Sequence, residues 1–191
     1  MSLRDLRTAL LLLLGMTLLL GVGYPLAVWA VARLAFPAQA RGSLVCNGPD
    51  IIGSSLIGQG FDAPRYFWGR PSATTPRPYD GTASGGSNLG PLNPALIDKV
   101  QSAARALRAA DPGNTDPIPV DLVTASASGL DPDISVAGAR YQAGRVARER
   151  GIAREEVEAL ISRHQRGPWL GILGEPRVNV LELNLELDRR R

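Results

Sequence analysis

Residues 8–32 read TALLLLLGMTLLLGVGYPLAVWAVA and contain no charged side chain, with Arg7 before them and Arg33 after them. A helix of this length is about 37 Å long, which is enough to cross a hydrocarbon core of about 30 Å with some tilt. No comparable stretch follows in the sequence. We therefore predict one transmembrane helix over residues 8–33 that carries one water-soluble domain.

A cleavable signal peptide is the alternative interpretation of this stretch. The small residues Ala38, Gln39 and Ala40 resemble a cleavage site, and cleavage there leaves a mature chain that starts at Arg41. Signal-peptide cores, however, have about 7 to 15 apolar residues, and this core is far longer. The length favours a retained anchor.

The cationic residues around the helix predict its orientation. Arg4 and Arg7 precede it at close range, whereas Arg33 and Arg41 follow it at wider spacing. Cytoplasmic flanks carry an excess of Lys and Arg, so a cytoplasmic N-terminus and an extracytoplasmic domain are favoured by a small margin. Trp29 near the far end of the helix suits the interfacial aromatic belt.

The chain is expected to divide into a short tail (1–7), the transmembrane helix (8–33), a linker (34–41) and a single α+β extracytoplasmic domain (42–191). The basic side chains of this domain nearly balance its acidic ones, although the whole chain has a net charge of +3. The composition therefore gives no support to nucleic-acid binding. Cys46 is the only cysteine, so an internal disulfide is impossible, and we expect it to be half-buried in a strand.

Local patterns predict the elements of the domain. Residues 61–94 are rich in Pro, Gly and Ser yet hold half of the aromatic residues, which indicates an ordered functional loop rather than a disordered linker. Capping residues and hydrophobic periodicity predict the remaining elements. These are strands 43–46 and 51–57 around an Asn47-Gly48 turn, a helix capped by Asn93, a short strand over 118–124, a helix from Ser135 to Arg150 closed by Gly151, a helix over 154–164, and a final strand in which Leu181, Leu183, Leu185 and Leu187 alternate with polar residues.

Small residues inside the transmembrane stretch predict contact with other helices. Pro25 would clash with the carbonyl of residue 21, and a glycine stands there. Gly23 and Ala27 form a small-xxx-small pair, which lets a second helix approach closely. We expect Gly21, Gly23, Pro25 and Ala27 to pack against partner helices rather than only to anchor the chain.

Candidate chemical motifs in the domain are sparse. The segment 84–88 (SGGSN) is rich in glycine, but it lacks the lysine of a phosphate-binding P-loop, and a structural turn is favoured for it. Asp131 and Asp133 precede a predicted helix, where carboxylates favour the positive end of the dipole. His164 and Cys46 lie far apart in the sequence, so neither a metal site nor an independent hydrolase is predicted.

A set of short strings, in this order and spacing, resembles the C subunit of the Kdp potassium-transporting P-type ATPase of bacteria and archaea. The strings are GSSLIGQ (53–59), YF (66–67), GRPSA (69–73), SGGSNL (84–89), NP (93–94), PVDLVTAS (119–126), SGLD (128–131), IS (134–135), GEPRVNV (174–180) and LNL (183–185). The resemblance runs from the transmembrane helix almost to the end of the chain. Val136 departs from it, because the family often has proline after the serine.

The resemblance implies a non-catalytic accessory subunit of a high-affinity potassium uptake pump in the cell (inner) membrane. Its implied partners are a channel-like potassium-translocating subunit, a P-type ATP-hydrolysing subunit, a small single-span subunit and the bilayer. ATP and potassium are then ligands of the complex, and no cofactor is bound tightly by this chain.

The family is also described as a catalytic chaperone that raises the ATP affinity of the hydrolysing subunit. This role falls on Ser84, Gly85, Gly86, Ser87 and Asn88, and with less support on Gln59. An extracytoplasmic domain cannot touch cytoplasmic ATP, so indirect coupling is the physical expectation. Two alternatives stay open: a membrane-anchored extracytoplasmic binding module that is independent of the pump and uses the 61–94 loop, and an anchored enzyme, which the missing catalytic constellation disfavours.

Overall fold

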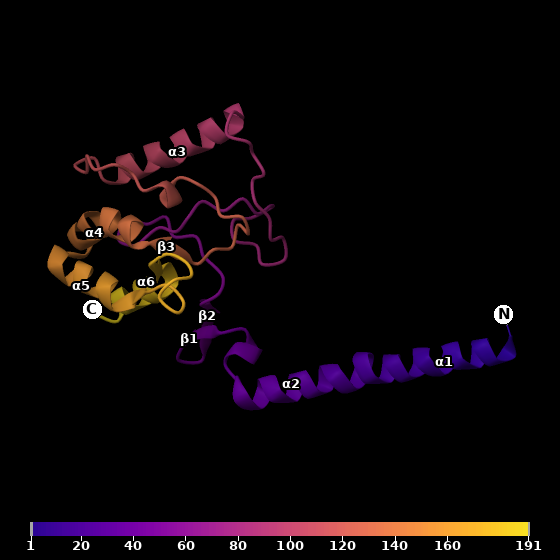
Figure 1. Ribbon diagram of the computed structural model, residues 1–191. Coiled ribbons are helices and arrows are strands. Elements are labelled where there is room, and N and C mark those ends of the chain that lie inside the picture. The colour runs from indigo at the N-terminus through magenta and orange to yellow at the C-terminus, as the bar shows by residue number, and fades with distance from the viewer. Residues whose placement is uncertain (1, 191) are drawn as a thin grey trace. The chain divides into compact units, whose positions relative to one another are not determined.

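The computed structural model describes residues 2–190 and divides into two compact units. The first unit runs as far as Leu44 and contains a long N-terminal helix, and the second begins at Val45 and contains the other long helices and a three-stranded sheet. Figure 1 shows the order of the elements along the chain. The predicted fold class, an α+β domain with one candidate membrane helix, is confirmed.

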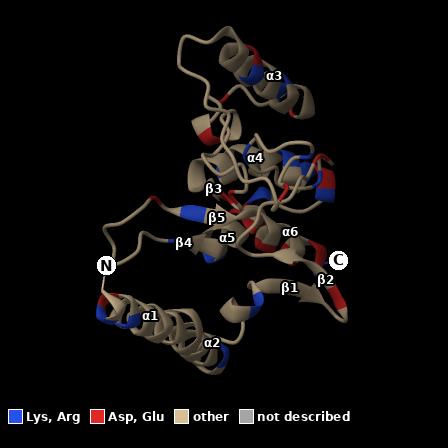
Figure 2. Ribbon diagram, turned by 90° about the vertical axis from the view of Figure 1, so that its right-hand side faces the viewer, with Lys and Arg blue, Asp and Glu red and all other residues tan. Residues whose placement is uncertain are grey.

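The first unit is dominated by a continuous apolar helix over Leu3–Ala35, made of α1 (Leu3–Leu18), η1 (Leu19–Gly23) and α2 (Tyr24–Ala35). Ser2 begins it with a capping box, in which its hydroxyl accepts from the Asp5 N–H and the Asp5 carboxylate accepts from the Ser2 N–H. The helix therefore starts before the predicted residue 8. No side chain of its apolar core is buried in the chain, and charged residues lie only near its two ends (Figure 2).

A wide turn in the middle of this helix accommodates its proline. Pro25 has no N–H to donate to the Gly21 carbonyl, and its ring crowds the carbonyl four residues back. The segment just before it, η1, is a π-helix, and the Tyr24 N–H donates to the carbonyl of Leu19, five residues earlier. The wider π turn relieves the crowding without breaking the helix.

A two-stranded sheet connects the units: β1 (Leu44–Asn47) pairs with β2 (Asp50–Ser54). The two turn residues are Gly48 and Pro49 rather than the predicted Asn47-Gly48. Gly48 has φ +63°, the positive value that the first position of a tight hairpin turn requires. The second strand ends at Ser54, because its hydroxyl accepts from the Leu56 N–H and turns the chain. Cys46 lies in β1 as predicted, but it is exposed rather than half-buried.

The segment from residue 55 to residue 93 contains neither helix nor strand, and its aromatic residues hold it to the domain. Phe67 is completely buried in the core, and Trp68 packs against that core. The rings of Phe61 and Tyr66 lie 5.4 Å apart between centroids. The segment is therefore held against the core, which agrees with the prediction that it is ordered.

The helix α3 (Pro94–Ala110) begins at Asn93 as predicted, because the Asn93 side chain accepts from the Ala95 N–H at 2.9 Å. Leu107 is its only buried residue, and Ile97 on the same predicted face is about half exposed. The helix lies along the outside of the domain, apart from the other helices (Figure 1).

The strand predicted over 118–124 is wrong. The segment forms the 3₁₀ turn η3 (Val120–Leu122), in which the Leu122 N–H donates to the Pro119 carbonyl at 3.1 Å. Pro119 has no N–H for a strand ladder, and Leu122 is the only side chain of the turn that is buried. The turn also aims Asp121 at the start of the next helix.

The two central helices agree with the sequence. Ser135 caps α4 (Val136–Arg150) by accepting from the Gly138 N–H at 2.8 Å, and Gly151 ends it with φ +65°. The helix α5 (Arg154–His164) follows at once and packs against α4.

A small antiparallel sheet supports these helices. Its strands are β3 (Asp133–Ser135), β4 (Gln165–Arg166) and β5 (Arg177–Asn179), in the order β3-β5-β4. Val178 of β5 lies opposite Ile134 on one side and opposite Gln165 on the other. The sheet therefore joins the segment before α4 to the segment before the last helix.

The last segment is a helix, not the predicted strand. The helix α6 (Val180–Asp188) begins at Asn179, whose side chain accepts from the Glu182 N–H at 3.1 Å. The alternating leucines hide a helical period, because the buried residues Val180, Leu183, Asn184 and Leu187 follow the spacing i, i+3, i+4, i+7. The Asn179 cap and this second period outweigh the alternation.

The hydrophobic core lies where α4, α5, α6 and β5 meet. Its fully buried apolar side chains include Phe67, Ile134, Val146, Val157, Leu160, Ile161, Val178 and Leu183. Phe67 comes from the irregular loop, so the loop is part of the core and not an appendage to it.

Candidate functional site

The small residues of the membrane helix have free space around them. A Cβ built on Gly21 would come no closer than 3.8 Å to the Thr17 side chain, and one on Gly23 no closer than 3.6 Å to the Leu18 carbonyl. Both distances are ordinary van der Waals contacts. Ala27 follows Gly23 by four residues in α2, so the two share one face of the helix. Among the described residues, no atom comes close enough to a Cβ at either position to exclude a side chain there.

The glycine-rich segment 84–88 packs closely against the backbone of residues 126–129. The Gly85 N–H donates to the Ser128 carbonyl at 2.8 Å, and the Ser84 hydroxyl donates to the same oxygen at 3.2 Å. A Cβ on Gly86 would lie 2.9 Å from the Ala127 carbonyl oxygen. The glycines are explained by this close approach of two backbones.

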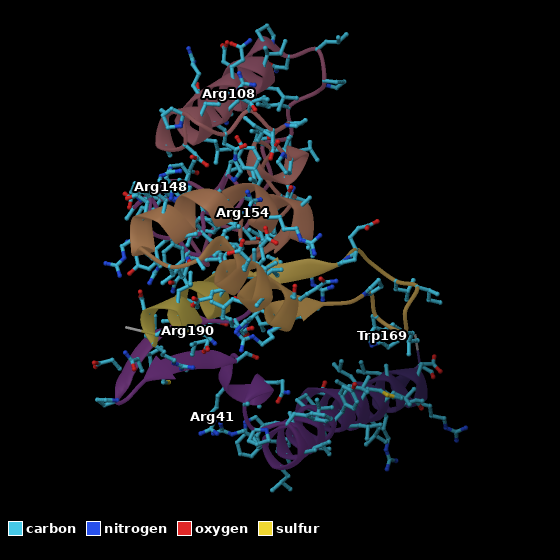
Figure 3. The ribbon with its side chains drawn as sticks, turned by 90° about the vertical axis from the view of Figure 1, so that its left-hand side faces the viewer. Arg41, Arg108, Arg148, Arg154, Trp169 and Arg190 are labelled. Atoms are coloured by element: carbon cyan, nitrogen blue, oxygen red, sulfur yellow. The ribbon has the colours of Figure 1, made fainter. Side chains whose placement is uncertain are left out.

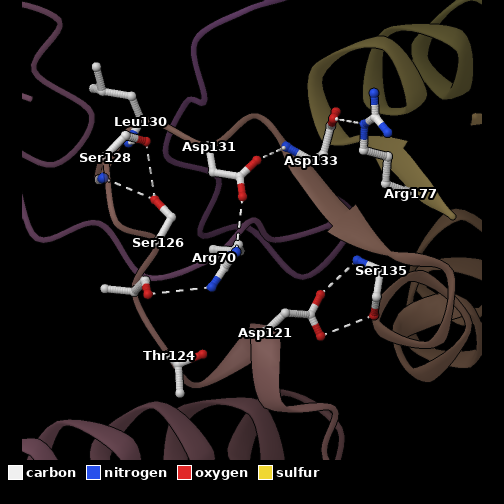
Figure 4. A network of polar contacts seen from close by, with 12 residues as sticks. Arg70, Asp121, Thr124, Ser126, Ser128, Leu130, Asp131, Asp133, Ser135 and Arg177 are labelled. Atoms are coloured by element: carbon white, nitrogen blue, oxygen red, sulfur yellow. Dashed lines mark hydrogen bonds and ion pairs between the residues drawn. The ribbon is translucent and has the colours of Figure 1, made fainter. Parts of the chain in front are cut away.

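The facing segment has glycine for the same reason. Gly129 has φ +67°, and a Cβ there would lie 2.7 Å from the Gly85 carbonyl oxygen. The Ser126 and Ser128 hydroxyls accept from the N–H groups of Gly129 and Leu130 and hold the turn (Figure 4). Two strings that are far apart in the sequence thus form one structural unit.

Ser87 of the glycine-rich segment lines a cleft of about 380 Å³. Ser72 and Thr124 line it from the loops, and Lys99 and Ser102 line it from α3. Lys99 is the one cation among the lining residues that the structure describes. Asp98 of α3 also lines the cleft, so its lining offers hydroxyl groups together with one positive and one negative charge.

A network of ion pairs joins the loops to the small sheet (Figure 4). The Arg70 guanidinium donates to the Asp131 carboxylate at 3.0 Å and to the Ala125 carbonyl at 3.4 Å. The second oxygen of Asp131 accepts from the Asp133 N–H at 3.0 Å. Asp133 in turn pairs with Arg177 of β5 at 2.9 Å. Each of these two acids is neutralised by an arginine.

Asp121 and Ser135 provide the cap of α4. The Asp121 carboxylate accepts from the Ser135 N–H at 2.7 Å and from its hydroxyl at 3.0 Å. The prediction that Asp131 and Asp133 cap this helix is wrong, because both are committed to arginines. Six of the ten strings that resemble the family meet around this network and the paired loops beside it: GRPSA, SGGSNL, PVDLVTAS, SGLD, IS and GEPRVNV.

Tyr79 holds the irregular segment 55–93 in place beside Arg70. Its hydroxyl donates to the Arg70 carbonyl, and Gly58 and Gly69 leave room for its ring. Burial, with a smaller contribution from the Asp131 carboxylate, raises the pKa of Tyr79 to about 12. The residue therefore stays protonated, and keeps this hydrogen bond, through the physiological range.

A buried arginine was missed by the sequence reasoning. Arg145 of α4 is 1 % exposed; it donates to the carbonyls of Pro64 and Tyr66 and to the Gln142 side chain, and lies 4.6 Å from the centroid of the Trp68 ring. Burial lowers its pKa to about 10, so it remains charged at neutral pH. A polar Gln142 within the buried face of α4 was the available signal of such a buried polar cluster.

The described residues, 2–190, hold no cluster of three or more His, Cys, Asp or Glu side chains that could bind a metal ion. Their buried polar groups serve the fold: Gln142 and Asn184 hold the backbone of Trp68 and Phe67, and Asn179 donates to the Ser55 carbonyl and to Asp133. These contacts tie the irregular segment to α4, α6 and β5.

Comparisons with known proteins agree with the sequence resemblance. The family model described as "KdpC: K+-transporting ATPase, c chain" matches residues 6–189. A protein from Methylibium petroleiphilum named "Potassium-transporting ATPase KdpC subunit" is 66% identical over 186 residues, which cover 97% of each chain. Proteins with the same name from Variovorax paradoxus (63% identical; 95% of this chain and 94% of the relative) and Sorangium cellulosum (60% identical; 99% and 100%) are similar along their whole length. The chain therefore belongs to the KdpC family, the c chains of K+-transporting ATPases.

Proposed function

We propose that this chain is the membrane-anchored accessory subunit of an ATP-driven, high-affinity potassium uptake pump. The observation that carries the proposal is the helix Leu3–Ala35, which has a fully exposed apolar core and glycines that no contact in the chain explains. Such a helix suits close packing against other membrane helices. The proposed partners are a channel-like potassium-translocating subunit, a P-type ATP-hydrolysing subunit and a small single-span subunit.

The proposed role is assembly and stabilisation rather than catalysis. The charged side chains that could be candidates for catalytic groups make structural contacts instead. These side chains are Arg145, Asp121 and Asp131. ATP and potassium are proposed as ligands of the whole complex. The domain contributes a rigid surface whose loops are tied together by the network around Arg70 and Asp131.

We further propose that any effect on ATP affinity is indirect. Arg4 and Arg7 before the helix favour a cytoplasmic N-terminus, which leaves the domain and its segment 84–88 outside the cytoplasm in the bacterial or archaeal cell (inner) membrane. From there the domain can stabilise one state of the pump, and a shift in the populations of its states then changes the apparent ATP affinity.

Thiol labelling tests this orientation. In a Cys46→Ser background, a Ser87→Cys variant is exposed to a membrane-impermeant maleimide in intact cells with a permeable outer membrane. Labelling before lysis is expected for an extracytoplasmic domain. Protection until lysis would restore direct contact between segment 84–88 and ATP. Wild-type Cys46, which is exposed in the same domain, provides an independent reporter.

Co-purification tests the assembly role. The tagged chain is isolated from potassium-starved membranes solubilised in mild detergent, and the proposed partners are identified by mass spectrometry. Gly23→Leu and Ala27→Leu are expected to reduce their recovery at least about tenfold, because the added side chains prevent close helix approach. Ala32→Leu is the matched control, because residue 32 lies on the other side of the helix from Gly23. Recovery of the chain with no membrane partner would instead support an independent binding module.

A further inference from the structure

An exposed apolar loop stands out on the domain. Between β4 and β5, residues 167–174 contain no charged side chain, and the charged residues Arg166 and Glu175 flank them. Trp169, Leu170, Ile172 and Leu173 expose 66%, 72%, 79% and 55% of their surface. Figure 3 shows Trp169 at the edge of the domain, on the side opposite to α3 and its Arg108. Four large apolar side chains gathered at one tip indicate a contact surface.

Four backbone N–H groups of this loop donate to carbonyls within the loop. The Trp169 N–H donates to the Leu173 carbonyl at 2.8 Å, and the Leu173 N–H donates back to the Trp169 carbonyl at 3.0 Å. The N–H groups of Gly171 and Ile172 donate to the carbonyls of Pro168 and Trp169. Lipid chains cannot hydrogen-bond, so these internal hydrogen bonds lower the cost of bringing the loop to the edge of the hydrocarbon region.

The chain also keeps the domain close to a membrane. The apolar helix ends at Ala35 and the second compact unit begins at Val45. The segment 36–44 between them spans at most about 30 Å when fully extended. A membrane surface is therefore always within reach of the domain. Tryptophan, moreover, is the side chain that prefers the bilayer interface, where its ring is apolar and its N–H can reach polar headgroups.

We propose that the loop 167–174 is a second membrane contact, in which Trp169, Leu170, Ile172 and Leu173 enter the boundary between headgroups and acyl chains. The proposal rests on the helix Leu3–Ala35 being a membrane anchor, as the proposed function requires. One anchor leaves the domain free to rotate about its tether, and a second contact restricts it. The loop then sets which face of the domain points toward the membrane and which is left for other subunits.

Fluorescence in reconstituted vesicles tests the proposal. The full chain, with Cys46→Ser and Ile172→Cys, is labelled with the environment-sensitive dye NBD and placed in vesicles of phosphatidylethanolamine and phosphatidylglycerol. We expect a blue-shifted emission, of which lipids spin-labelled near the headgroup quench about half. The same dye at Ala109→Cys on α3 is the matched control, and its emission should be neither shifted nor quenched.

Two further variants check the chemistry of the contact. Trp169→Glu, whose side chain is exposed and therefore dispensable for folding, is expected to abolish the shift and the quenching at residue 172, and Trp169→Phe to preserve them. Dye that stays unquenched in vesicles overturns the proposal, and so does dye that shifts only after the other subunits of the pump are added. Carbonate extraction of the vesicles tests the anchor separately, because release of the chain contradicts the helix Leu3–Ala35 as anchor rather than the loop.

Discussion

Glycines of the apolar helix Leu3–Ala35 and glycines of the loops of the domain have different surroundings. In the helix, a Cβ on Gly15 would meet no atom within 4 Å, and one on Gly23 would stay 3.6 Å from its nearest neighbour. In the loops, a Cβ on Gly58 would lie 2.5 Å from the Tyr79 ring and 2.6 Å from the Asp131 carbonyl oxygen. A Cβ on Gly86 would lie 2.9 Å from the Ala127 carbonyl oxygen.

The difference separates two explanations for a glycine. Gly58 and Gly86 are explained within the chain, because a side chain at either position would displace backbone or an aromatic ring. The helix glycines have no such explanation, although each weakens a soluble helix by about 1 kcal/mol relative to alanine. We propose that their small size serves packing against partner helices.

A substitution at Gly58 gives the strongest test of the difference between loop and helix glycines. Gly58→Ala is expected to lower the free energy of unfolding of the domain by about 3 kcal/mol, because the added methyl group overlaps both the Tyr79 ring and backbone. Urea titration of the full chain in detergent, followed by tryptophan fluorescence, measures it. Gly60→Ala is the control, because its Cβ meets nothing within 4 Å, and a change within about 0.5 kcal/mol is expected. Equal effects at both positions would contradict the crowding argument.

The domain is expected to lose stability at high pH, because the buried hydroxyl of Tyr79 ionises there. Its folded pKa of about 12 lies above its ordinary value of 10, so the folded state holds the proton more tightly than the unfolded state. This contribution, about 2 kcal/mol, is complete below pH 10 and is lost as the pH rises from 10 to 12. Unfolding measured across this range should show it.

Tyr79→Phe is the matched variant for this pH dependence. It removes the ionisable hydroxyl together with the hydrogen bond to the Arg70 carbonyl, so it is expected to be less stable by about 1 kcal/mol at neutral pH. Its stability should decline less between pH 10 and 12 than that of the wild type. The same decline in both chains would show that Tyr79 does not titrate as its burial predicts.

The elements that could be predicted from sequence are those with local signals. Asn93, Ser135 and Gly151 mark helix ends through contacts within a few residues, and the structure confirms all three. The errors lie where long-range packing decides. Residues 120–122 turn because Pro119 cannot donate to a strand ladder and Asp121 is held by Ser135 at the start of α4. Residues 180–188 form a helix because Asn179 caps them and their helical face meets the core.

The candidate site was less predictable, because its contacts join distant residues. Segment 84–88 is held by Ser128, and Arg70 is held by Asp131, 61 residues later. A sequence shows that the glycines are present but not which backbone they approach. The buried Arg145 is a similar case: Gln142 is a local signal of a buried polar cluster, but the other partners of Arg145 are carbonyl groups of the irregular loop, which the residue types do not reveal.

A substitution at Gly86 tests the same difference within the glycine-rich segment 84–88. Gly86→Ala is expected to cost about 1.5 kcal/mol of unfolding free energy, because the Ala127 carbonyl has to move by a few tenths of an ångström. Gly85→Ala, beside it, is the control, since its Cβ would come no closer than 3.9 Å to another atom. If Gly86→Ala leaves urea unfolding unchanged, the glycine is not explained by packing, and a ligand role for segment 84–88 becomes the better explanation.

The smallest effect is expected in the membrane helix. Gly23→Ala adds one methyl group in free space, so the urea midpoint of the domain should not change and helicity by circular dichroism in detergent should stay the same or rise slightly. Destabilisation of the chain on its own would mean that Gly23 has an internal role, and the contrast with Gly58 and Gly86 would fail. If the chain alone is unaffected while Gly23→Leu loses its partners, the glycine is explained only by what packs against it. The two parts of the molecule then differ in kind: the loops use glycine to close the domain on itself, and the helix uses it to leave a place for another chain.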